Sequence, residues 1–406
     1  MKRIVCLLVL TVLFLSVIPC LSAETTAKSD QVTVSINGTV KNLKQPPVIL
    51  GNLVFIPMRE IFIQCGYDVK QDTVITNMRY KKGKTDIIVP LYKTYVIKNG
   101  LRIETNNKMQ LVNGNMFITP DMAGRLMDAE VSWDSIKKTI VISTARNVSE
   151  PYAWAKDNML IAHGLGAING ATATNSLEAL EYNYQAGYRV FEIDLAATSD
   201  DKLVAVHDWD TFTGFIKNTF PELAWKVPTH EQFKGAKFYG YLTPLDFTDI
   251  ANIMSAHKDI YIVTDTKSAD AAVIKKQFEQ IVNAAKSVDE SILKRIIPQL
   301  YSEEMLGIVN KIHKFDSYIY TLYMVYSPDY KVVDFAVKNN IKVVTMAPPR
   351  FTDKFIKMLA EKGIYIYLHT INSMYEIENY RKKGARGFYS DFVTPNYIKF
   401  KYDDTI

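Results

Sequence analysis

Apolar and polar positions follow two different rhythms along the chain. From about 31 to 145, short apolar runs of strand length are separated by turn residues. From about 158 onward, apolar runs such as "LIAHG", "VFEIDLAA" and "IYIVTDTK" alternate with helical patterns such as "NSLEALEYNYQAG" and "PLDFTDIANIMSAH". The change of rhythm predicts two folded domains, residues 31–145 and residues 155–402.

The second rhythm predicts an α/β fold. Near-continuous apolar strands that alternate with helices form a parallel sheet covered by helices, and about 250 residues of this alternation are typical of a (β/α)8 TIM barrel. The sequence offers nine strand candidates, one more than a closed barrel takes. Only a few residues around Asp200-Asp201 separate "FEIDL" from "LVAVHD", too few for a parallel crossover. These two strands should form a hairpin, and a two-residue turn at Asp200-Asp201 would place Asp194 opposite His207.

The first domain contains an internal repeat. "GNLVFIPMREIFIQCGYDVKQDTVIT" at 51–76 is echoed by "GNMFITPDMAGRLMDAEVSWDSIKKTIVIS" at 114–143. Each unit predicts a strand, a proline, a short amphipathic helix and two further strands. We expect a small duplicated α+β domain in which the two units bury their apolar faces together. The region has no histidine and no acidic cluster, so catalysis is not expected here.

The amino terminus has the layout of a secretory signal. Basic residues precede an apolar run from Ile4 to Ile18, and Pro19 and the small pair Ser22-Ala23 follow. We predict a signal peptide at 1–23 and a secreted, extracellular protein, either free or associated with the cell surface. An uncleaved anchor is the alternative, although the run is short for a membrane span. Cys65 is then the one cysteine left, and its helical setting predicts a buried apolar side chain.

Composition excludes some partners. The chain carries 48% hydrophobic and 22% charged residues, with a net charge of +5. Removing Lys2 and Arg3 with the signal leaves about +3. No basic run approaches the clusters that bind a phosphate backbone, so no nucleic-acid partner is expected.

Candidate catalytic residues gather at the ends of predicted barrel strands. Glu192 and Asp194 share one face of their strand, and Asp265 and Lys267 share a face of the next barrel strand. Catalytic groups of such barrels lie at the carboxyl ends of the strands. His163 ends the first strand at that mouth, and the hairpin should return His207 to it.

These residue types suit a metal-dependent reaction on a phosphodiester. Three converging carboxylates need a compensating cation, and Mg²⁺ or Ca²⁺ prefers oxygen ligands. We therefore assign Glu192, Asp194 and Asp265 to a metal, and His163 and His207 to acid–base catalysis. Lys267 supplies positive charge for an anion.

Other polar residues receive weaker interpretations. A lone strand histidine is usually a satisfied core residue, and strand-end acids often cap turns; the joint placement favours function. His369, in "YLHTIN", is a candidate substrate contact. His230, His257 and His313 fall in helical or loop patterns and are expected at the surface. Arg350 is interpreted as a surface cation.

Two resemblances sharpen these expectations. Residues 31–145 resemble the copper amine oxidase N-terminal-like domain through "VSINGTVKN", "NLVFIPMREIF" and "AEVSWDSIKKTIVIS". That module recurs in secreted proteins of Gram-positive bacteria, and the likeness implies a spacer or a cell-wall or surface contact, without copper chemistry. Residues 158–397 resemble the glycerophosphodiester phosphodiesterase family, a group of phospholipase-C-like barrels. The matching stretches are "IAHG", "AGYRVFEIDLAATSDDKLVAVHD", "YIVTDTK", "HTIN" and "GARGFYSDFVTP".

The second resemblance implies roles and also shows departures. It implies metal ligands at Glu192 and Asp194, an acid–base pair at His163 and His207, and phosphate contact by Lys267. Gly164 stands where the family usually has an arginine that clamps phosphate. The usual Pro-Glu-Asn-Thr reads "ATNS" here, which keeps Asn175, a candidate substrate contact, and places Thr174 where an acid is usual.

The usual Glu-x-Lys of the family reads Asp265-Thr266-Lys267, a version that also occurs in sphingomyelinase-D-type barrels. We therefore expect a secreted phosphodiesterase of lipid metabolism that hydrolyses glycerophosphodiesters or a related lipid or wall-polymer headgroup. The alternatives are phospholipase-D-like cleavage of intact phospholipid and an inactive surface binding protein.

Overall fold

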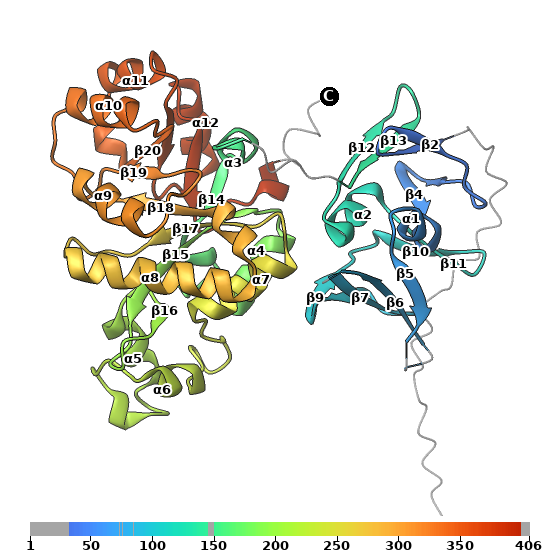
Figure 1. Cartoon of the computed structure of the whole chain (residues 1–406), viewed down its shortest axis with the longest axis horizontal. Coiled ribbons are helices and arrows are strands. Elements are labelled where there is room, and N and C mark those ends of the chain that lie inside the picture. The colour runs from blue at the N-terminus through green and yellow to red at the C-terminus, as the bar shows by residue number, and fades with distance from the viewer. Residues whose placement is uncertain (1–31, 73, 75, 84, 145–149, 399–406) are drawn as a thin grey trace, which may run out of the picture.

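The protein forms a small β-rich domain followed by a helix-covered barrel (Figure 1). The computed structural model describes residues 32–144, apart from 73, 75 and 84, and residues 150–398. The predicted signal at 1–23 lies outside the described residues. Within the described part of the chain, no helix has the length and apolar character needed to cross a bilayer.

The first domain contains three sheets, ordered β12-β13-β1-β2, β10-β11-β4-β3 and β5-β6-β7-β8-β9. Its strands are β1 (Thr33–Ile36), β2 (Thr39–Lys41), β3 (Val48–Leu50), β4 (Leu53–Pro57), β5 (Asp68–Gln71), β6 (Asn77–Lys82), β7 (Thr85–Pro90), β8 (Tyr95–Lys98), β9 (Leu101–Glu104), β10 (Met109–Val112), β11 (Asn115–Ile118), β12 (Glu130–Asp134) and β13 (Thr139–Ser143). Its helices are α1 (Met58–Gln64) and α2 (Pro120–Met127).

The predicted duplication is visible in the element order. The unit β4-α1-β5-β6 is repeated as β11-α2-β12-β13, and β4 pairs with β11 antiparallel. Apolar residues of both helices, including Ile61 and Phe62 of α1 and Met122 and Leu126 of α2, are fully buried in one shared core. Cys65 is buried in the same core, as its helical setting predicted.

The second domain is a closed barrel of eight parallel strands, which confirms the predicted fold class. Neighbouring strands follow the order β14-β22-β21-β20-β19-β18-β17-β15, and β14 also pairs with β15 to close the ring. The strands are β14 (Leu160–Ala162), β15 (Val190–Ala197), β17 (Tyr261–Asp265), β18 (Ile296–Leu300), β19 (Ile319–Thr321), β20 (Val343–Met346), β21 (Tyr365–Leu368) and β22 (Gly387–Ser390).

Helices surround the barrel and connect its strands. They are α3 (Ala153–Asp157), α4 (Leu177–Gln185), α5 (Trp209–Ile216), α6 (His230–Gly235), α7 (Phe247–Ala256), α8 (Ala271–Val288), α9 (Glu303–Ile312), α10 (Asp329–Lys338), α11 (Asp353–Ala360) and α12 (Met374–Lys382). Several begin at capping residues that accept a backbone N–H, such as Ser176 for α4 and Asp270 for α8. Their apolar faces and the outward strand residues form the larger core.

A second apolar layer fills the amino end of the barrel. Val190 and Val263 belong to this layer and are fully buried. Trp154 of α3 packs into the same layer, and its indole Nε1 donates to Ser317 Oγ at 3.0 Å. This layer closes one end of the barrel, so polar chemistry is left to the carboxyl end.

The ninth strand candidate is the predicted hairpin partner, but its predicted register was wrong by one residue. β16 (Leu203–Ala205) pairs antiparallel with β15, with Leu195 opposite Ala205. Asp194 therefore lies opposite Val206, whose N–H donates to the Asp194 carbonyl at 3.0 Å, and not opposite His207. The turn has three residues and ends at Asp201, whose backbone is in the left-handed region (φ 64°). Three-residue loops of this kind are common in hairpins, and the prediction of a two-residue turn was therefore one residue too short.

Candidate active site

Three carboxylates face the inside of the barrel above its apolar layer. Glu192 and Asp194 lie two and four residues beyond Val190 on β15, and Asp265 lies two residues beyond Val263 on β17. Strand alternation therefore turns all three side chains inward. They are 1%, 1% and 7% exposed, and one carboxylate oxygen from each lies within 4.8 Å of the others.

Backbone and amide donors hold the two carboxylates of β15. The Asn175 Nδ2 donates to Asp194 Oδ2 at 2.8 Å, and its Oδ1 accepts the Asp194 N–H at 3.0 Å. The Gly164 N–H donates to Glu192 Oε2 at 2.6 Å. Asn175, a predicted substrate contact, is fully buried in this structure, and its amide orients Asp194.

The electrostatics of the cluster fit a divalent cation. Burial and the charge of Asp194 raise the pKa of Glu192 well above its usual range, and the same two causes raise the pKa of Asp265. Glu192 Oε1 is buried without a hydrogen-bond partner among the described residues. An unpartnered carboxylate oxygen beside two further carboxylates is a donor set that suits a hard cation such as Mg²⁺ or Ca²⁺.

Two tyrosines support Asp265. The hydroxyls of Tyr301 and Tyr323 both donate to Asp265 Oδ1, the latter at 3.0 Å. Tyr301 directly follows β18 and Tyr323 follows β19, so both reach the cluster from neighbouring barrel strands. They leave Asp265 Oδ2 free of these two donors.

Lys267 joins the cluster to the hairpin. Its Nζ lies 2.6 Å from Asp194 Oδ1 and donates to the His207 carbonyl at 3.2 Å. Burial lowers the pKa of Lys267, but the nearby carboxylates, Asp194 first, outweigh it and raise the pKa above its usual value. The predicted anion-binding lysine is therefore a charged group at the edge of the cluster.

His163 is oriented by an aspartate that directly follows the last barrel strand. Its Nδ1 lies 2.9 Å from Asp391 Oδ1, and the Asn372 Nδ2 donates to Asp391 Oδ2 at 2.7 Å. Burial lowers the pKa of His163, but the bond to Asp391 and the charge of Glu192 outweigh it and raise the pKa to about 9. This arrangement fixes the ring and leaves Nε2 as the nitrogen that can exchange a proton.

His207 has a similar local partner. Its Nδ1 lies 2.7 Å from Asp208 Oδ2, and Asp208 also caps α5 by accepting the Thr211 N–H at 2.7 Å. The ring is partly exposed. His207 lies beyond the end of β16, and the bond from Lys267 to its carbonyl ties it to the carboxylate cluster.

His369, the remaining predicted contact, directly follows β21. Burial, with a smaller contribution from His163, lowers its pKa to about 4, so the ring is neutral. Its Nε2 is buried without a hydrogen-bond partner among the described residues. The ring makes edge-to-face contacts with the rings of Tyr323 and Tyr389. Its role as a substrate contact stays a prediction.

Sequence reasoning missed three residues that support the site, namely Asp391, Tyr301 and Tyr323. Each lies at or just beyond the carboxyl end of a barrel strand. The rule that selected Asp194 and Asp265 could therefore have found them. Their partners, however, lie far away in the sequence: Asp391 is 228 residues from His163.

Gly164 is required by the local backbone. It has φ 53°, and a Cβ at this position would lie 2.5 Å from the Cα of Ala173. An arginine, which the family resemblance places here, cannot be accommodated without moving that backbone. Thr174, at the position of the usual acid, bonds to the Ser176 hydroxyl at 2.9 Å.

Of the other histidines, His257 corrects an expectation. It was expected at the surface but is only 4% exposed, and burial lowers its pKa to about 3. It directly follows α7, and its ring centroid lies 4.6 Å from that of Tyr184, with the two ring planes tilted by 57°. His230 does remain partly exposed, with its Nε2 2.9 Å from Asp246 Oδ2.

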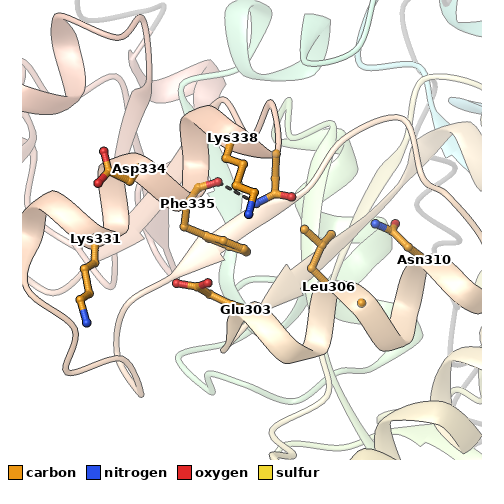
Figure 2. A pocket seen from close by; sticks show the side chains of 9 residues that line it. Glu303, Leu306, Asn310, Lys331, Asp334, Phe335 and Lys338 are labelled. Atoms are coloured by element: carbon orange, nitrogen blue, oxygen red, sulfur yellow. Dashed lines mark hydrogen bonds between the residues drawn. The ribbon is translucent and has the colours of Figure 1, made fainter.

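A separate surface groove of about 420 Å³ lies between α9 and α10 (Figure 2). Its lining mixes both signs of charge, with Glu303 and Asp334 near Lys331 and Lys338. It contains no histidine, so it lacks the acid–base groups found at the mouth of the barrel. The carboxylate cluster remains the candidate active site.

Comparison with known families places the chain among barrel enzymes that hydrolyse phosphoric diesters. Residues 166–394 match the glycerophosphoryl diester phosphodiesterase family, and the chain belongs to this family. Residues 35–142 match the copper amine oxidase N-terminal domain. No curated protein matches the chain.

Solved structures similar to the barrel include several phosphodiesterases. One is a putative glycerophosphoryl diester phosphodiesterase from Silicibacter pomeroyi DSS-3, with 15% identity, a TM-score of 0.48, and coverage of 61% of this chain and 94% of that chain. Another is a glycerophosphodiester phosphodiesterase from Parabacteroides distasonis, with 16% identity, a TM-score of 0.49, and coverage of 61% and 98%. A third is an Oleispira antarctica phosphodiesterase in complex with the product sn-glycerol-3-phosphate, with 16% identity, a TM-score of 0.49, and coverage of 61% and 99%.

Proposed function

We propose that the protein is a secreted, metal-dependent phosphodiesterase that uses His163 and His207 for proton transfer. Its substrates would be glycerophosphodiesters or a related lipid or wall-polymer headgroup. Family membership supports phosphodiester hydrolysis in general. The metal and the two histidines are our extension of it to this site.

The observation that carries the proposal is the buried cluster of three carboxylates with an unpartnered Glu192 oxygen. Glu192, Asp194 and Asp265 would hold Mg²⁺ or Ca²⁺, because the Lys267 ammonium beside Asp194 compensates only part of the charge of three buried acids. When bound, the cation would polarise the phosphoryl oxygens and stabilise charge that develops on them.

His163 and His207 would transfer the protons of the reaction. Carboxylate partners orient the Nδ1 of both His163 and His207 toward the protein, which leaves each Nε2 to act on the substrate. One imidazole would take the proton of the attacking hydroxyl as its oxygen bonds to phosphorus. The other would protonate the leaving oxygen as its bond to phosphorus breaks.

A glycerol headgroup offers its own nucleophile. The hydroxyl adjacent to the phosphoester can attack phosphorus, release the alcohol and form a cyclic phosphate, which water then opens. Lys267, the charged group beside Asp194, would bind a phosphate oxygen in place of the missing arginine clamp. A single ammonium positions phosphate less rigidly than a bidentate guanidinium does, so we expect a modest substrate affinity.

The amino-terminal parts have proposed roles as well. Residues 1–23 would direct secretion and be removed, and the first domain would act as a spacer or contact the cell surface. Sequencing the amino terminus of the protein recovered from culture medium tests the first proposal. A mature chain that begins near residue 24 is expected, and a chain that retains residues 1–23 would contradict it.

Turnover of glycerophosphocholine tests the catalytic proposal. We expect hydrolysis with Mg²⁺ or Ca²⁺, loss of hydrolysis after chelation, and recovery when the ion is restored. Turnover of phosphatidylcholine, measured beside that of glycerophosphocholine, separates phospholipase-D-like cleavage of intact phospholipid from glycerophosphodiester cleavage. Failure to hydrolyse any phosphodiester would instead favour a surface binding protein.

A further inference from the structure

Exposed aromatic side chains line part of the barrel mouth. Tyr326 follows β19 and is 95% exposed, Tyr375 follows β21 and is 73% exposed, and Phe392 follows β22 and is 51% exposed. Tyr323 and Met324, also beyond β19, are exposed to a smaller degree. We name these five residues the aromatic rim.

The rim residues lie in short stretches without charged residues. Tyr323, Met324 and Tyr326 belong to the loop between β19 and α10, and Phe392 lies just beyond β22. Tyr375 is in the first turn of α12, where the exposed Glu376 follows it. Residues 322–328, 370–375 and 392–395 contain no lysine, arginine, aspartate or glutamate. The strands that precede these loops are close together in the barrel, in the order β22-β21-β20-β19. Their carboxyl ends therefore form one continuous arc of the mouth.

Arg350, an arginine beside the rim, is bonded to the backbone. Arg350 follows β20, and its guanidinium donates to the carbonyls of Val325 and Ser327, both at 2.6 Å. It also lies 3.6 Å from the carboxylate of Asp329. The guanidinium thus bonds to the backbone on both sides of Tyr326. The Arg350 side chain is 22% exposed, so the predicted surface cation is partly buried against this loop.

The composition of this arc is that of a membrane-interface surface. Exposed tyrosine, phenylalanine and methionine gain free energy when their apolar surface leaves water, and aromatic side chains are enriched at the level of the headgroups. Clustered exposed apolar groups also mark contact sites more often than surfaces that face only water.

The rim is continuous with the candidate active site, and this fixes the kind of partner. Tyr323 is a rim residue whose hydroxyl donates to Asp265 of the carboxylate cluster. Phe392 directly follows Asp391, which orients His163. Any surface that covers the rim therefore also faces the carboxylate cluster. A phospholipid bilayer is such a surface, and its headgroups would present phosphodiesters to the cluster.

We propose that the aromatic rim docks the catalytic domain on a phospholipid bilayer, so that the enzyme takes lipid headgroups directly from the membrane surface. The inference rests on the proposed function and narrows its substrate class. It assigns to the rim a role in access to substrate and none in the chemical step.

Vesicle binding tests the proposal without turnover. The variant carries Tyr326→Ser, Tyr375→Ser and Phe392→Ser. The matched control carries Tyr92→Ser, Leu111→Ser and Ile136→Ser in the first domain, where these side chains are 82%, 48% and 93% exposed. Co-sedimentation with vesicles of phosphatidylcholine, with and without phosphatidylglycerol, is measured in chelator and in Ca²⁺.

The wild type and the control should bind vesicles, and the rim variant should bind at least about tenfold more weakly, because three apolar side chains no longer enter the interface. Equal binding by all three proteins, or no binding by the wild type, would overturn the proposal. The proposal would also be overturned if the wild type were a dimer, and if the rim variant were a monomer with unchanged vesicle binding, because the rim would then be a contact between two copies of the chain. Glycerophosphocholine turnover should be the same in all three proteins, and its absence in the wild type would count against the proposed function while leaving the vesicle result valid.

Discussion

At the scale of single residues, buried charge organises the site. Glu192 and Asp194 lie where an apolar strand would otherwise continue, and each receives one or more fixed donors. Sequence reasoning could select these acids from strand alternation alone. It could not show that Asn175 serves Asp194, because that pairing depends on how the loop before α4 folds over β15.

The Glu192 carboxylate should lower the stability of the metal-free protein and increase its affinity for the metal. In chelator, Glu192→Gln should unfold at a temperature no lower than that of the wild type, because a buried charge is replaced by a neutral amide. Its affinity for Mg²⁺ or Ca²⁺ should fall at least about tenfold, measured by titration calorimetry. An unchanged affinity would remove Glu192 from the proposed ligands, and Glu178→Gln, an acid outside the cluster, serves as the control.

The bond between His163 and Asp391 should make the metal-free protein less stable as pH rises. The pKa of His163 is about 9 in the folded chain and about 6.5 when unfolded, so the native state binds more protons in between. The extra stability is full below pH 6.5 and is lost as pH rises through 9.

Asp391→Asn should remove that contribution. We expect it to lower the free energy of unfolding by about 1–2 kcal/mol at pH 6 and by clearly less at pH 9.5, measured by urea denaturation in chelator. Asp208→Asn, which alters the exposed partner of His207, should change stability much less. A loss that is equal at both pH values would contradict the assignment.

At the scale of elements, the sequence predicted the alternation of strands and helices and the hairpin of β15 and β16. The register failed because the loop uses three residues, and the side chain of Asp200 is occupied by Thr198 and by the His230 N–H. His257 was misjudged because its position after α7 gave no sign that Tyr184 would cover it. Turn type and long-range covering are decided by tertiary packing.

The turn that follows β14 should tolerate only glycine at position 164. Gly164→Ala places a Cβ against the Ala173 backbone, and we expect a loss of about 2–4 kcal/mol in the free energy of unfolding. Gly170→Ala is the matched control, because it also has positive φ but meets no atom within 4 Å. Its cost should be about 1 kcal/mol. Equal costs at the two positions would contradict the close approach.

At the scale of the whole molecule, the two domains have separate apolar cores. The first domain has its own apolar core, and the described histidines all lie in the barrel domain. The repeat and the barrel were both predictable because each follows from periodic patterns. The aromatic rim was not, since its loops have no periodicity and come together only when the barrel closes.

Removal of the first domain should therefore leave the chemistry intact. A chain that begins at residue 150 should hydrolyse glycerophosphocholine with a kcat/KM within about threefold of that of the chain that begins at residue 24. The same comparison with Asp194→Asn in both chains sets the inactive baseline. A large loss in the shorter chain, with folding verified by circular dichroism, would assign the first domain a part in catalysis.

The most direct test of the central claim is the metal-dependent rate of phosphodiester hydrolysis in matched histidine variants. His207→Ala removes a proposed proton-transfer group, whereas His230→Ala removes a histidine that is also bonded to a carboxylate but belongs to α6, outside the cluster. With Mg²⁺ or Ca²⁺ restored, His230→Ala should retain the wild-type rate and His207→Ala should lose at least about 100-fold. A wild-type rate for His207→Ala, or hydrolysis that persists in chelator, would contradict the account.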